Sequence, residues 1–235
     1  MPGAKVAVAG ATGRLGRHLV ELLAARGDVV PISRADGVDL ISGDGLAGAL
    51  AGVEWVVDAS NAPSSGQAAA TRFFTTAARN LQTFGARSGL RGLVIVSIIG
   101  CDRFGTGYYA AKHAHEQAAL AGPVPARVVR ISQFHELVES LLERRSVRRM
   151  RTQPVAARSA AAALLDAEPA EIAGPREERL ADLVRLVAAK RGRQAEIEEV
   201  SDPDDPDRAA YEGGALLPGP GALLVGPTFR EWLDR

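Results

Sequence analysis

The sequence has a single cysteine, Cys101, among its 235 residues, which excludes an internal disulfide and any CxxC metal or redox motif. It also has no excess of one charge, because 28 Lys and Arg residues balance 28 Asp and Glu residues. Without a net positive field we expect no binding to nucleic acid or to anionic membranes. Lysine is scarce, and the few that occur (Lys5, Lys112 and Lys190) reflect a compositional preference for arginine.

Long hydrophobic runs are absent as well. No stretch approaches the roughly 20 apolar residues of a membrane span. The N-terminal run MPGAKVAVAGATG is too short for the apolar core of a signal peptide. We therefore expect a cytoplasmic protein with no membrane attachment. Apolar residues make up 46% of the chain and charged residues 24%, as in an ordinary globular protein, which excludes disordered and collagen-like chains.

Short apolar runs alternate along the chain with longer helical patterns. This alternation predicts the α/β class with a doubly wound parallel sheet. We interpret residues 1–235 as a single domain in which residues 133–235 contribute a smaller C-terminal lobe. The predicted strands are Lys5–Ala9, Val29–Ser33, Gly37–Ile41, Glu54–Ala59, Leu93–Ser97 and Arg127–Ile131. The predicted helices run from Gly13 to Ala25, over 67–87, over 108–120 and, less regularly, over 135–144, 160–166 and 178–189.

A glycine-rich loop, GATGRLG at residues 10–16, follows the first predicted strand and opens the first helix. Glycines there permit a tight turn and a close approach of backbone to a pyrophosphate, whose charge then lies at the helix N-terminus. The spacing of Gly10, Gly13 and Gly16 is a weak signal alone, but its place between a strand and an amphipathic helix strengthens it. The alternative is a strand–helix turn without a ligand. We interpret the loop as the dinucleotide site of a Rossmann fold.

The end of the second predicted strand bears on which dinucleotide this site binds. An acidic residue there usually binds the ribose 2′-hydroxyl of NAD, whereas an arginine suits the 2′-phosphate of NADP. The strand ends Ile32-Ser33-Arg34, and the guanidinium of Arg34 can bind a phosphate through two donors. Asp36 is the competing acid, although Asp36-Gly37 is typical of a turn. The sequence thus favours NADP(H) over NAD(H).

A tyrosine and a lysine stand four residues apart at the start of the helix over 108–120. The spacing puts Tyr108 and Lys112 on one helical face. A lysine ammonium beside a phenol lowers the pKa of the phenol, which then serves as a proton donor or acceptor near neutral pH. Ser97, at the end of the fifth predicted strand, can orient a carbonyl oxygen. A helix-start aromatic with a solvated lysine is the alternative interpretation.

With these motifs the chain resembles the short-chain dehydrogenase/reductase superfamily, and within it the atypical NmrA-like NAD(P)-binding proteins. The Gly-x-x-Gly-x-x-Gly spacing is that of the extended and atypical members. The resemblance runs over nearly the whole chain. The motifs that carry it are GATGRLG at 10–16, SR at 33–34, VDL at 38–40, VVDASN at 56–61, LVIVSIIG at 93–100, YYAAK at 108–112, RISQFHELV at 130–138 and TFREWL at 228–233.

The resemblance implies which residues bind the cofactor. Those of the glycine loop would contact the pyrophosphate, those after the second strand the adenosine, and those after the fourth the nicotinamide ribose. The implied cofactor residues are Gly10, Thr12, Gly13, Arg14, Leu15, Gly16, Ser33, Arg34, Asp39, Leu40, Ala59, Ser60, Asn61 and Lys112.

The resemblance also implies a catalytic set. Ser97 would bind the substrate carbonyl, Tyr108 would transfer the proton, and Lys112 would hold the ribose hydroxyls and tune Tyr108. Residues bordering the nicotinamide and the substrate would be Gln133, Phe134 and His135 in a small substrate lobe. Ser97 is closer to the tyrosine than is usual, and Tyr109 is the alternative tyrosine. Asn80 is the only asparagine of the helix over 67–87. Two roles are open for it, contact with the cofactor loop or packing.

Three functions remain open at this stage. The first is an NADPH-dependent reductase of a small carbonyl or quinone. The second is a non-catalytic, NADP(H)-sensing regulator, since some NmrA-like proteins bind the cofactor without turnover. The third is an epimerase- or dehydratase-like enzyme that oxidises and re-reduces its substrate on tightly held NAD. A homodimer is a further possibility, because relatives usually pair through the helices over 67–87 and 108–120.

Other clusters are interpreted as structural. The basic segment Glu143–Arg151 is expected to be a solvated helix end rather than a nucleic-acid contact. His113 and His115 point to different faces of their helix, so we expect no metal site there. His135 follows the sixth strand, where a substrate contact and a packing role are both plausible.

Overall fold

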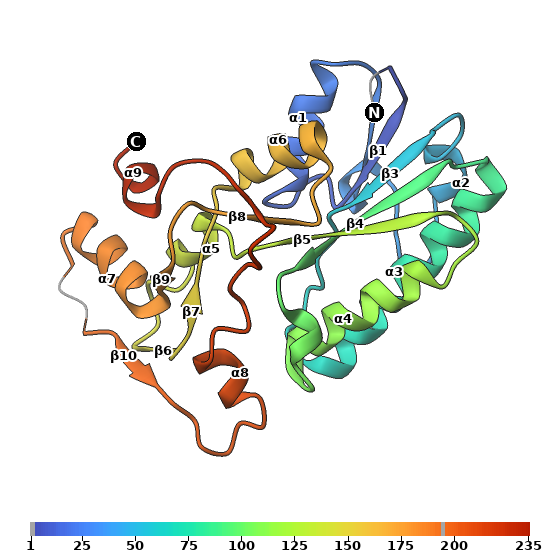
Figure 1. The fold of residues 1–235 in the computed structure, drawn as a ribbon. Helices are drawn as coiled ribbons and strands as arrows, with labels where there is room; N and C mark the ends of the chain where they lie inside the picture. Colours follow the sequence, from blue (N-terminus) through green and yellow to red (C-terminus); the bar gives the residue numbers. More distant parts are fainter. Residues whose placement is uncertain (1–2, 194–195) are drawn as a thin grey trace. The chain divides into compact units, whose positions relative to one another are not determined.

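The computed structural model describes residues 3–193 and 196–235 (Figure 1). The chain forms two compact units. The first comprises the residues up to Ser97 together with Thr106–Val129, and the second comprises Ile98–Gly105 together with Arg130–Arg235. The lobe predicted over 133–235 falls within the second unit, which also takes in residues 98–105.

The main element is one parallel sheet of seven strands in the order β11-β8-β5-β4-β3-β1-β2. This confirms the doubly wound α/β fold predicted from the alternation of apolar runs and helices. The central strands are short and rich in β-branched residues, which suits strands that are buried on both faces. The strands are β1 Val6–Ala9, β2 Val29–Ile32, β3 Trp55–Asp58, β4 Gly92–Ile98, β5 Ala126–Ile131, β8 Glu171–Ala173 and β11 Leu223–Leu224.

Helices cover the sheet of the first unit. Right-handed crossovers from β1 to β2 and from β3 to β4 run in opposite directions along the sheet, so α1 lies on one face and α3 and α4 lie side by side on the other (Figure 1). The point where the direction reverses, between β1 and β3, is where such sheets bind ligands. The helices are α1 Gly16–Ala24, α2 Leu46–Ala49, α3 Gln67–Ser88 and α4 Gly107–Leu120, with a 3₁₀ turn at Arg34–Asp36.

The core of the first unit joins α3 and α4 to the strands. Val56 and Ile95 from β3 and β4 are fully buried, as is Leu81 from α3. Gln82 adds a polar link, because its side-chain amide donates to the carbonyls of Ala119 at 2.6 Å and Val124 at 3.0 Å. These contacts fix the two helices that follow β3 and β4.

The strand predicted over Gly37–Ile41 is wrong. The carboxylate of Asp39 accepts the backbone N–H groups of Ile41 at 2.6 Å and Ser42 at 3.2 Å, which folds the segment into a turn. Gly37 and Gly43 have positive φ angles of 75° and 84°, which an extended strand does not allow. The chain therefore passes from β2 to β3 through turns and the short helix α2.

The second unit is built from shorter elements. Besides β8 and β11 it has two small sheets, in which β10 pairs with β6 in parallel and β7 pairs with β9 antiparallel. The helix predicted over 135–144 ends at Glu139. The remaining elements are a 3₁₀ turn at Cys101–Arg103, α5 His135–Glu139, β6 Ser146–Arg148, β7 Arg151–Thr152, α6 Ala157–Ala167, β9 Glu178–Arg179, α7 Leu180–Lys190, β10 Glu198–Val200, α8 Arg208–Glu212 and α9 Phe229–Leu233.

Candidate functional site

The glycine loop packs closely against the segment that follows β3. Gly10 has a φ of 74°, and a Cβ added there would lie 2.7 Å from the Ala59 carbonyl oxygen and from the Ser60 Cα. A Cβ on Gly16 would lie 2.0 Å from the Gly10 carbonyl oxygen. Both distances are far below van der Waals contact, so the fold itself requires these two glycines.

Gly13 differs from its two neighbours in the loop. A Cβ added there would have a single close neighbour, the Gly10 carbonyl oxygen at 3.1 Å, and Gly13 has no positive φ. Its backbone N–H donates to that same carbonyl at 2.9 Å. The fold can accommodate a methyl group here with a small shift, so packing alone does not account for glycine at this position.

The N-terminus of α1 suits an anion. Among the described residues no side chain caps it, and its first turn carries no acidic residue. Its backbone N–H groups and the positive end of its dipole can therefore interact with a phosphate. Thr12 and Arg14 are exposed beside this helix end, whereas Leu15 is buried in the core.

The residues after β2 form a small polar cluster. The Ser33 hydroxyl lies 2.5 Å from an Asp36 carboxylate oxygen, and Arg34 is exposed at the start of the 3₁₀ turn. Leu40 is buried, and its carbonyl accepts a hydrogen bond of 2.8 Å from the Asn80 side chain. Asn80 thus holds the turn at residues 39–43 against α3 and has a structural role.

Tyr108 extends from the start of α4 to the segment after β3. Its hydroxyl donates to the side-chain carbonyl of Asn61. The backbone N–H of Gly107 donates to Gln67 Oε1 at 3.0 Å, which ties the start of α4 to the start of α3. The ring of Tyr109 meets that of Tyr108 edge-on at 6.2 Å. The structure therefore connects Tyr108 with Asn61, and Asn61 follows the residues that pack on Gly10.

The pKa of Tyr108 differs from the sequence expectation. Burial raises it from 10 to about 12, whereas the neighbouring lysine was expected to lower it. The reason is that desolvation of the phenolate outweighs any stabilisation by Lys112, whose ammonium is bound elsewhere. Its Nζ lies 3.1 Å from His115 Nδ1 and 4.4 Å from the centroid of the Phe74 ring. At neutral pH Tyr108 is a protonated phenol and a hydrogen-bond donor.

Two buried residues of this region were missed by sequence reasoning. His115 and Asp58 are fully buried, and His115 Nε2 lies 2.9 Å from Asp58 Oδ2. Sequence signals for them existed, because Asp58 is a charged residue ending an apolar strand and His115 stands three residues after Lys112 on the same helical face. Ser97 is also buried, near the end of β4.

The predicted substrate residues belong to the second unit. Gln133 accepts a hydrogen bond from the Thr152 hydroxyl, and Phe134 pairs with Val155 through an isolated backbone bridge. His135 is fully buried, with its Nε2 2.9 Å from the Pro154 carbonyl and its ring against Phe229 and Trp232 (centroids 5.2 Å from each). His135 has a packing role in its own unit, and contact of these residues with substrate stays a prediction.

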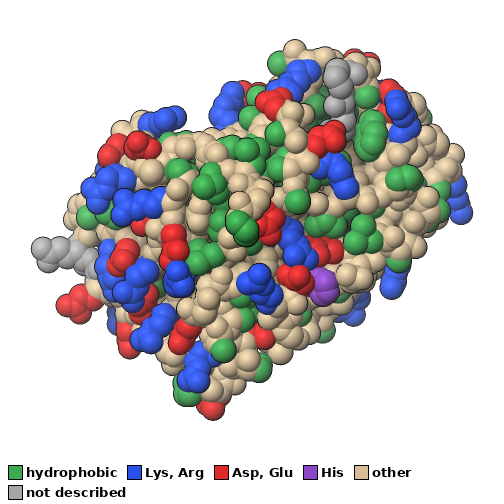
Figure 2. Space-filling model, viewed as in Figure 1, with side chains coloured by type: hydrophobic (Ala, Val, Ile, Leu, Met, Phe, Trp, Pro, Cys, Tyr) green, Lys and Arg blue, Asp and Glu red, His purple; other side chains and the backbone are tan. Residues whose placement is uncertain are grey.

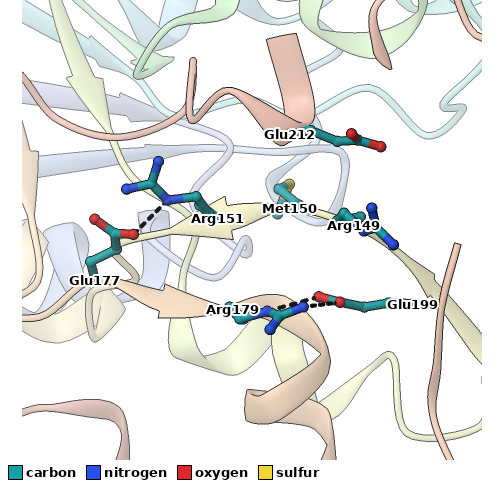
Figure 3. Close-up of a pocket in the computed structure, with 7 residues that line it drawn as sticks. All are labelled: Arg149, Met150, Arg151, Glu177, Arg179, Glu199 and Glu212. Atoms are coloured by element: carbon teal, nitrogen blue, oxygen red, sulfur yellow. Dashed lines mark hydrogen bonds and ion pairs between the residues drawn. The ribbon is translucent and has the colours of Figure 1, made fainter. Parts of the chain in front are cut away.

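A cavity of about 330 Å³ lies within the second unit (Figure 3). Two ion pairs span its wall, Arg151 with Glu177 and Arg179 with Glu199. The other lining residues are Arg149, Met150 and Glu212. The charged residues of the basic segment Glu143–Arg151 are solvated, as expected, but the predicted helix end is wrong. The segment forms β6 and β7, which pair with β10 and β9, and part of the cavity wall.

Charges of both signs are interspersed over the face shown in Figure 2. This matches the equal numbers of basic and acidic residues in the sequence. Within residues 3–193 and 196–235, the structure contains no helix long and apolar enough to cross a membrane.

Comparison with known proteins extends the description of the fold. No protein-family model and no curated protein matches the sequence. Among solved structures, a UDP-N-acetylglucosamine 4-epimerase from Bacillus cereus has 14% identity and a TM-score of 0.68, covering 99% of this chain and 97% of its own. MoeE5 in complex with UDP-glucuronic acid and NAD has 16% identity and a TM-score of 0.70, covering 98% and 96%.

A short-chain dehydrogenase/reductase superfamily protein from Agrobacterium tumefaciens, with bound NAD, has 17% identity and a TM-score of 0.66. The alignment covers 98% of this chain and 95% of that one. These values show a shared fold. The chain has the Rossmann-like α/β fold of short-chain dehydrogenase/reductase superfamily structures.

Proposed function

We propose that this protein is a nicotinamide-dinucleotide-dependent enzyme that transfers a hydride to or from a small-molecule substrate, with Tyr108 exchanging the proton. The observation that carries the proposal is the chain of contacts within the first unit. The glycine loop packs on Ala59 and Ser60, and the Tyr108 hydroxyl donates to the adjacent Asn61. These contacts bring a phosphate-binding helix end and an acid–base tyrosine to one edge of the sheet.

The residues present fit a dinucleotide. The uncapped N-terminus of α1 suits the pyrophosphate, and the absence of a side chain at Gly13 leaves the backbone open to it. When bound, the nicotinamide ring supplies or accepts the hydride. Tyr108 is protonated at neutral pH, since its pKa is about 12, and it is therefore ready to donate a proton to a carbonyl oxygen. Ser97 is the residue proposed to orient that oxygen, and Lys112 to hold the ribose.

For the cofactor we propose NADP(H), on the basis of the exposed Arg34 at the end of β2. Its guanidinium can form two hydrogen bonds with a 2′-phosphate. Asp36 is the group that would favour NAD(H), and its carboxylate lies against the Ser33 hydroxyl. The reaction we favour is the reduction of a small carbonyl or quinone by NADPH. Membership of the NmrA-like branch stays a prediction.

A second candidate is a redox-neutral reaction on a nucleotide sugar with retained NAD. The similar solved structures favour it, since they include a UDP-N-acetylglucosamine 4-epimerase and MoeE5 in complex with UDP-glucuronic acid and NAD. In this reaction the substrate is first oxidised and then reduced, so the cofactor is not consumed. The oxidation of the sugar would require Tyr108 to start as a phenolate that accepts the hydroxyl proton, and the pKa of about 12 therefore favours the reductase.

Turnover assays of wild type and Tyr108→Phe test this proposal. The panel contains carbonyls and quinones with NADPH, and UDP-sugars with NAD. Loss of the phenolic proton should lower turnover by about 100-fold or more while cofactor binding persists. Tyr109→Phe is the matched control and should retain activity. Net NADPH consumption identifies the reductase, and sugar isomerisation without net consumption identifies the second candidate. Cofactor binding with no turnover on either panel would favour the regulator.

A further inference from the structure

Three titratable side chains are buried together in the first unit. Lys112 and His115 come from α4 and Asp58 from the end of β3, and at most 4% of any of them is exposed. Lysine and aspartate are almost never fully buried unless they are paired. Here they are joined through the imidazole, because His115 Nδ1 lies 3.1 Å from Lys112 Nζ and His115 Nε2 lies 2.9 Å from Asp58 Oδ2.

The partners determine which ring nitrogen carries the proton. A lysine ammonium has only donors, so His115 Nδ1 must accept. The proton of the neutral ring is then on Nε2, which donates to Asp58. The second carboxylate oxygen of Asp58 accepts the backbone N–H of Ser60 at 2.9 Å. The hydrogen bonds therefore run in one direction from Lys112 through His115 to Asp58.

Charges in the surroundings support this protonation state. Burial alone would raise the pKa of Asp58, but His115 and Lys112 together hold it at about 2. Burial and the Lys112 charge lower the pKa of His115, against the opposing effects of Asp58 and Glu116. Near neutral pH the three groups are a carboxylate, a neutral imidazole and an ammonium, with no net charge.

Phe74, on α3, packs against His115 and Lys112 of this buried group and against Tyr108. Its ring stacks on His115 with centroids 5.0 Å apart and an interplanar angle of 24°. It meets the Tyr108 ring edge-on at 5.7 Å, and the Lys112 ammonium lies over its face. One fully buried aromatic ring thus contacts the tyrosine, the lysine and the histidine, and limits how each can turn.

We infer that His115 and Asp58 are positioning residues that fix the direction of the Lys112 ammonium. The orientation of the imidazole is set by Asp58, and the imidazole in turn accepts one N–H of Lys112. Because one donor of the ammonium is committed in this way, the directions of its other two are also determined. That the fixed Lys112 ammonium helps to bind the cofactor rests on the proposed function. The direction of the hydrogen bonds from Lys112 through His115 to Asp58 does not.

The tautomer of His115 tests the inference without any assay of activity. Long-range ¹H–¹⁵N correlation spectra of the full-length protein near pH 7 report which nitrogen of each of the four histidines is protonated. A His115→Gln variant assigns the relevant signals. We expect a neutral ring with the proton on Nε2, and a changed pattern in Asp58→Asn. A proton on Nδ1, or a doubly protonated ring, would overturn the inference.

Cofactor titration supplies the second readout. Gln at position 115 retains an acceptor for Lys112 and a donor for Asp58, whereas Leu retains neither, so His115→Gln should bind NADPH at least about tenfold more tightly than His115→Leu. His113→Gln, two residues away, is the control and should bind as wild type does. Equal binding by the two position-115 variants, both folded by circular dichroism, would refute the positioning role.

The two readouts separate this inference from the proposed function. If the wild type binds neither NADPH nor NADH, the proposed function fails, and the tautomer alone decides whether Asp58 and His115 orient Lys112. If His115→Leu does not fold, Asp58→Asn takes its place in the titration, with at least about tenfold weaker binding expected. Unchanged binding in a folded Asp58→Asn variant would also refute the inference.

Discussion

At the scale of single residues, the three glycines of the loop have different roles. The carbonyl of Gly10 closes the loop against Gly16, and Gly10 itself lies against the backbone after β3. Gly13 has space for a methyl group with little adjustment. The sequence spacing treats the three alike, and only the distances separate the glycines required by the fold from the one available to a ligand.

Gly16→Ala should be destabilised by about 1–3 kcal/mol, because the added Cβ would lie 2.0 Å from the Gly10 carbonyl oxygen and the loop must shift. Urea unfolding at neutral pH measures the change. Gly48→Ala in α2 is the control, since beyond its chain neighbours and the backbone of its own helix no atom lies within 4 Å of its added Cβ. Equal stability of Gly16→Ala and wild type would contradict the close packing of the loop.

Arg34→Ala should weaken NADPH binding by about tenfold or more and leave NADH binding nearly unchanged, because only NADPH has the 2′-phosphate that the guanidinium can bind. Fluorescence titration of both cofactors measures the difference. Arg87→Ala, an exposed arginine at the C-terminal end of α3, is the matched control. An equal loss for both cofactors would argue against a phosphate contact at Arg34.

At the scale of elements, the sequence predicted the central strands and the helices beside them well. Apolar runs such as Leu93–Ser97 are continuous and rich in β-branched residues, so β4 could be anticipated from the sequence. The turn at residues 39–43 could not be anticipated, because the hydrogen bond that the backbone N–H of Ile41 donates to the Asp39 carboxylate outweighs the local strand propensity. The short strands β6 to β11 depend on partners far away in the chain, which a local pattern does not contain.

In the candidate site, too, local patterns could be predicted from the sequence and contacts between distant residues could not. Gly10, Tyr108 and Lys112 stand in recognisable local patterns. Asp58 and His115 are 57 residues apart in sequence and meet only because β3 and α4 pack together. Their pairing was invisible in the sequence, although a charged residue at the end of a buried strand is a hint that it has a partner.

The buried contact of His135 with Phe229 and Trp232 in the second unit should make stability depend on pH. Burial lowers the pKa of His135 from 6.5 to about 4, so the unfolded chain takes up a proton at higher pH than the folded one. The free energy of unfolding therefore receives the full benefit of a neutral His135 above about pH 6.5. It falls by about 3 kcal/mol in total as the pH decreases toward 4.

Urea unfolding at several pH values between 7 and 4 measures this dependence. His135→Gln should lose less stability than wild type over that interval, because it has no imidazole to protonate. His113→Gln, at a half-buried position, is the control and should follow the wild-type curve. If the free energy of unfolding fell equally with pH in wild type and His135→Gln, protonation of His135 would not be the cause of the pH dependence.

At the scale of the whole molecule, the proposed function depends on one edge of a seven-stranded parallel sheet. The fold is shared with NAD-bound structures at 16–17% identity, which shows the architecture alone. The cofactor, the reaction and the pairing into dimers therefore rest on residues of this chain and on experiment. A small-molecule substrate rather than a nucleic acid stays a prediction from the equal numbers of basic and acidic residues.

The most direct test of the central claim is fluorescence titration of NADPH and NADH into wild type, Gly13→Ala and Gly48→Ala. We expect that wild type binds, that Gly13→Ala binds at least about tenfold more weakly while remaining folded, and that Gly48→Ala binds as wild type does. A methyl group at Gly13 would occupy space that the pyrophosphate needs, with only a small shift of the Gly10 carbonyl. Binding of neither cofactor to wild type, or equal binding by all three proteins, would contradict a dinucleotide site at the glycine loop.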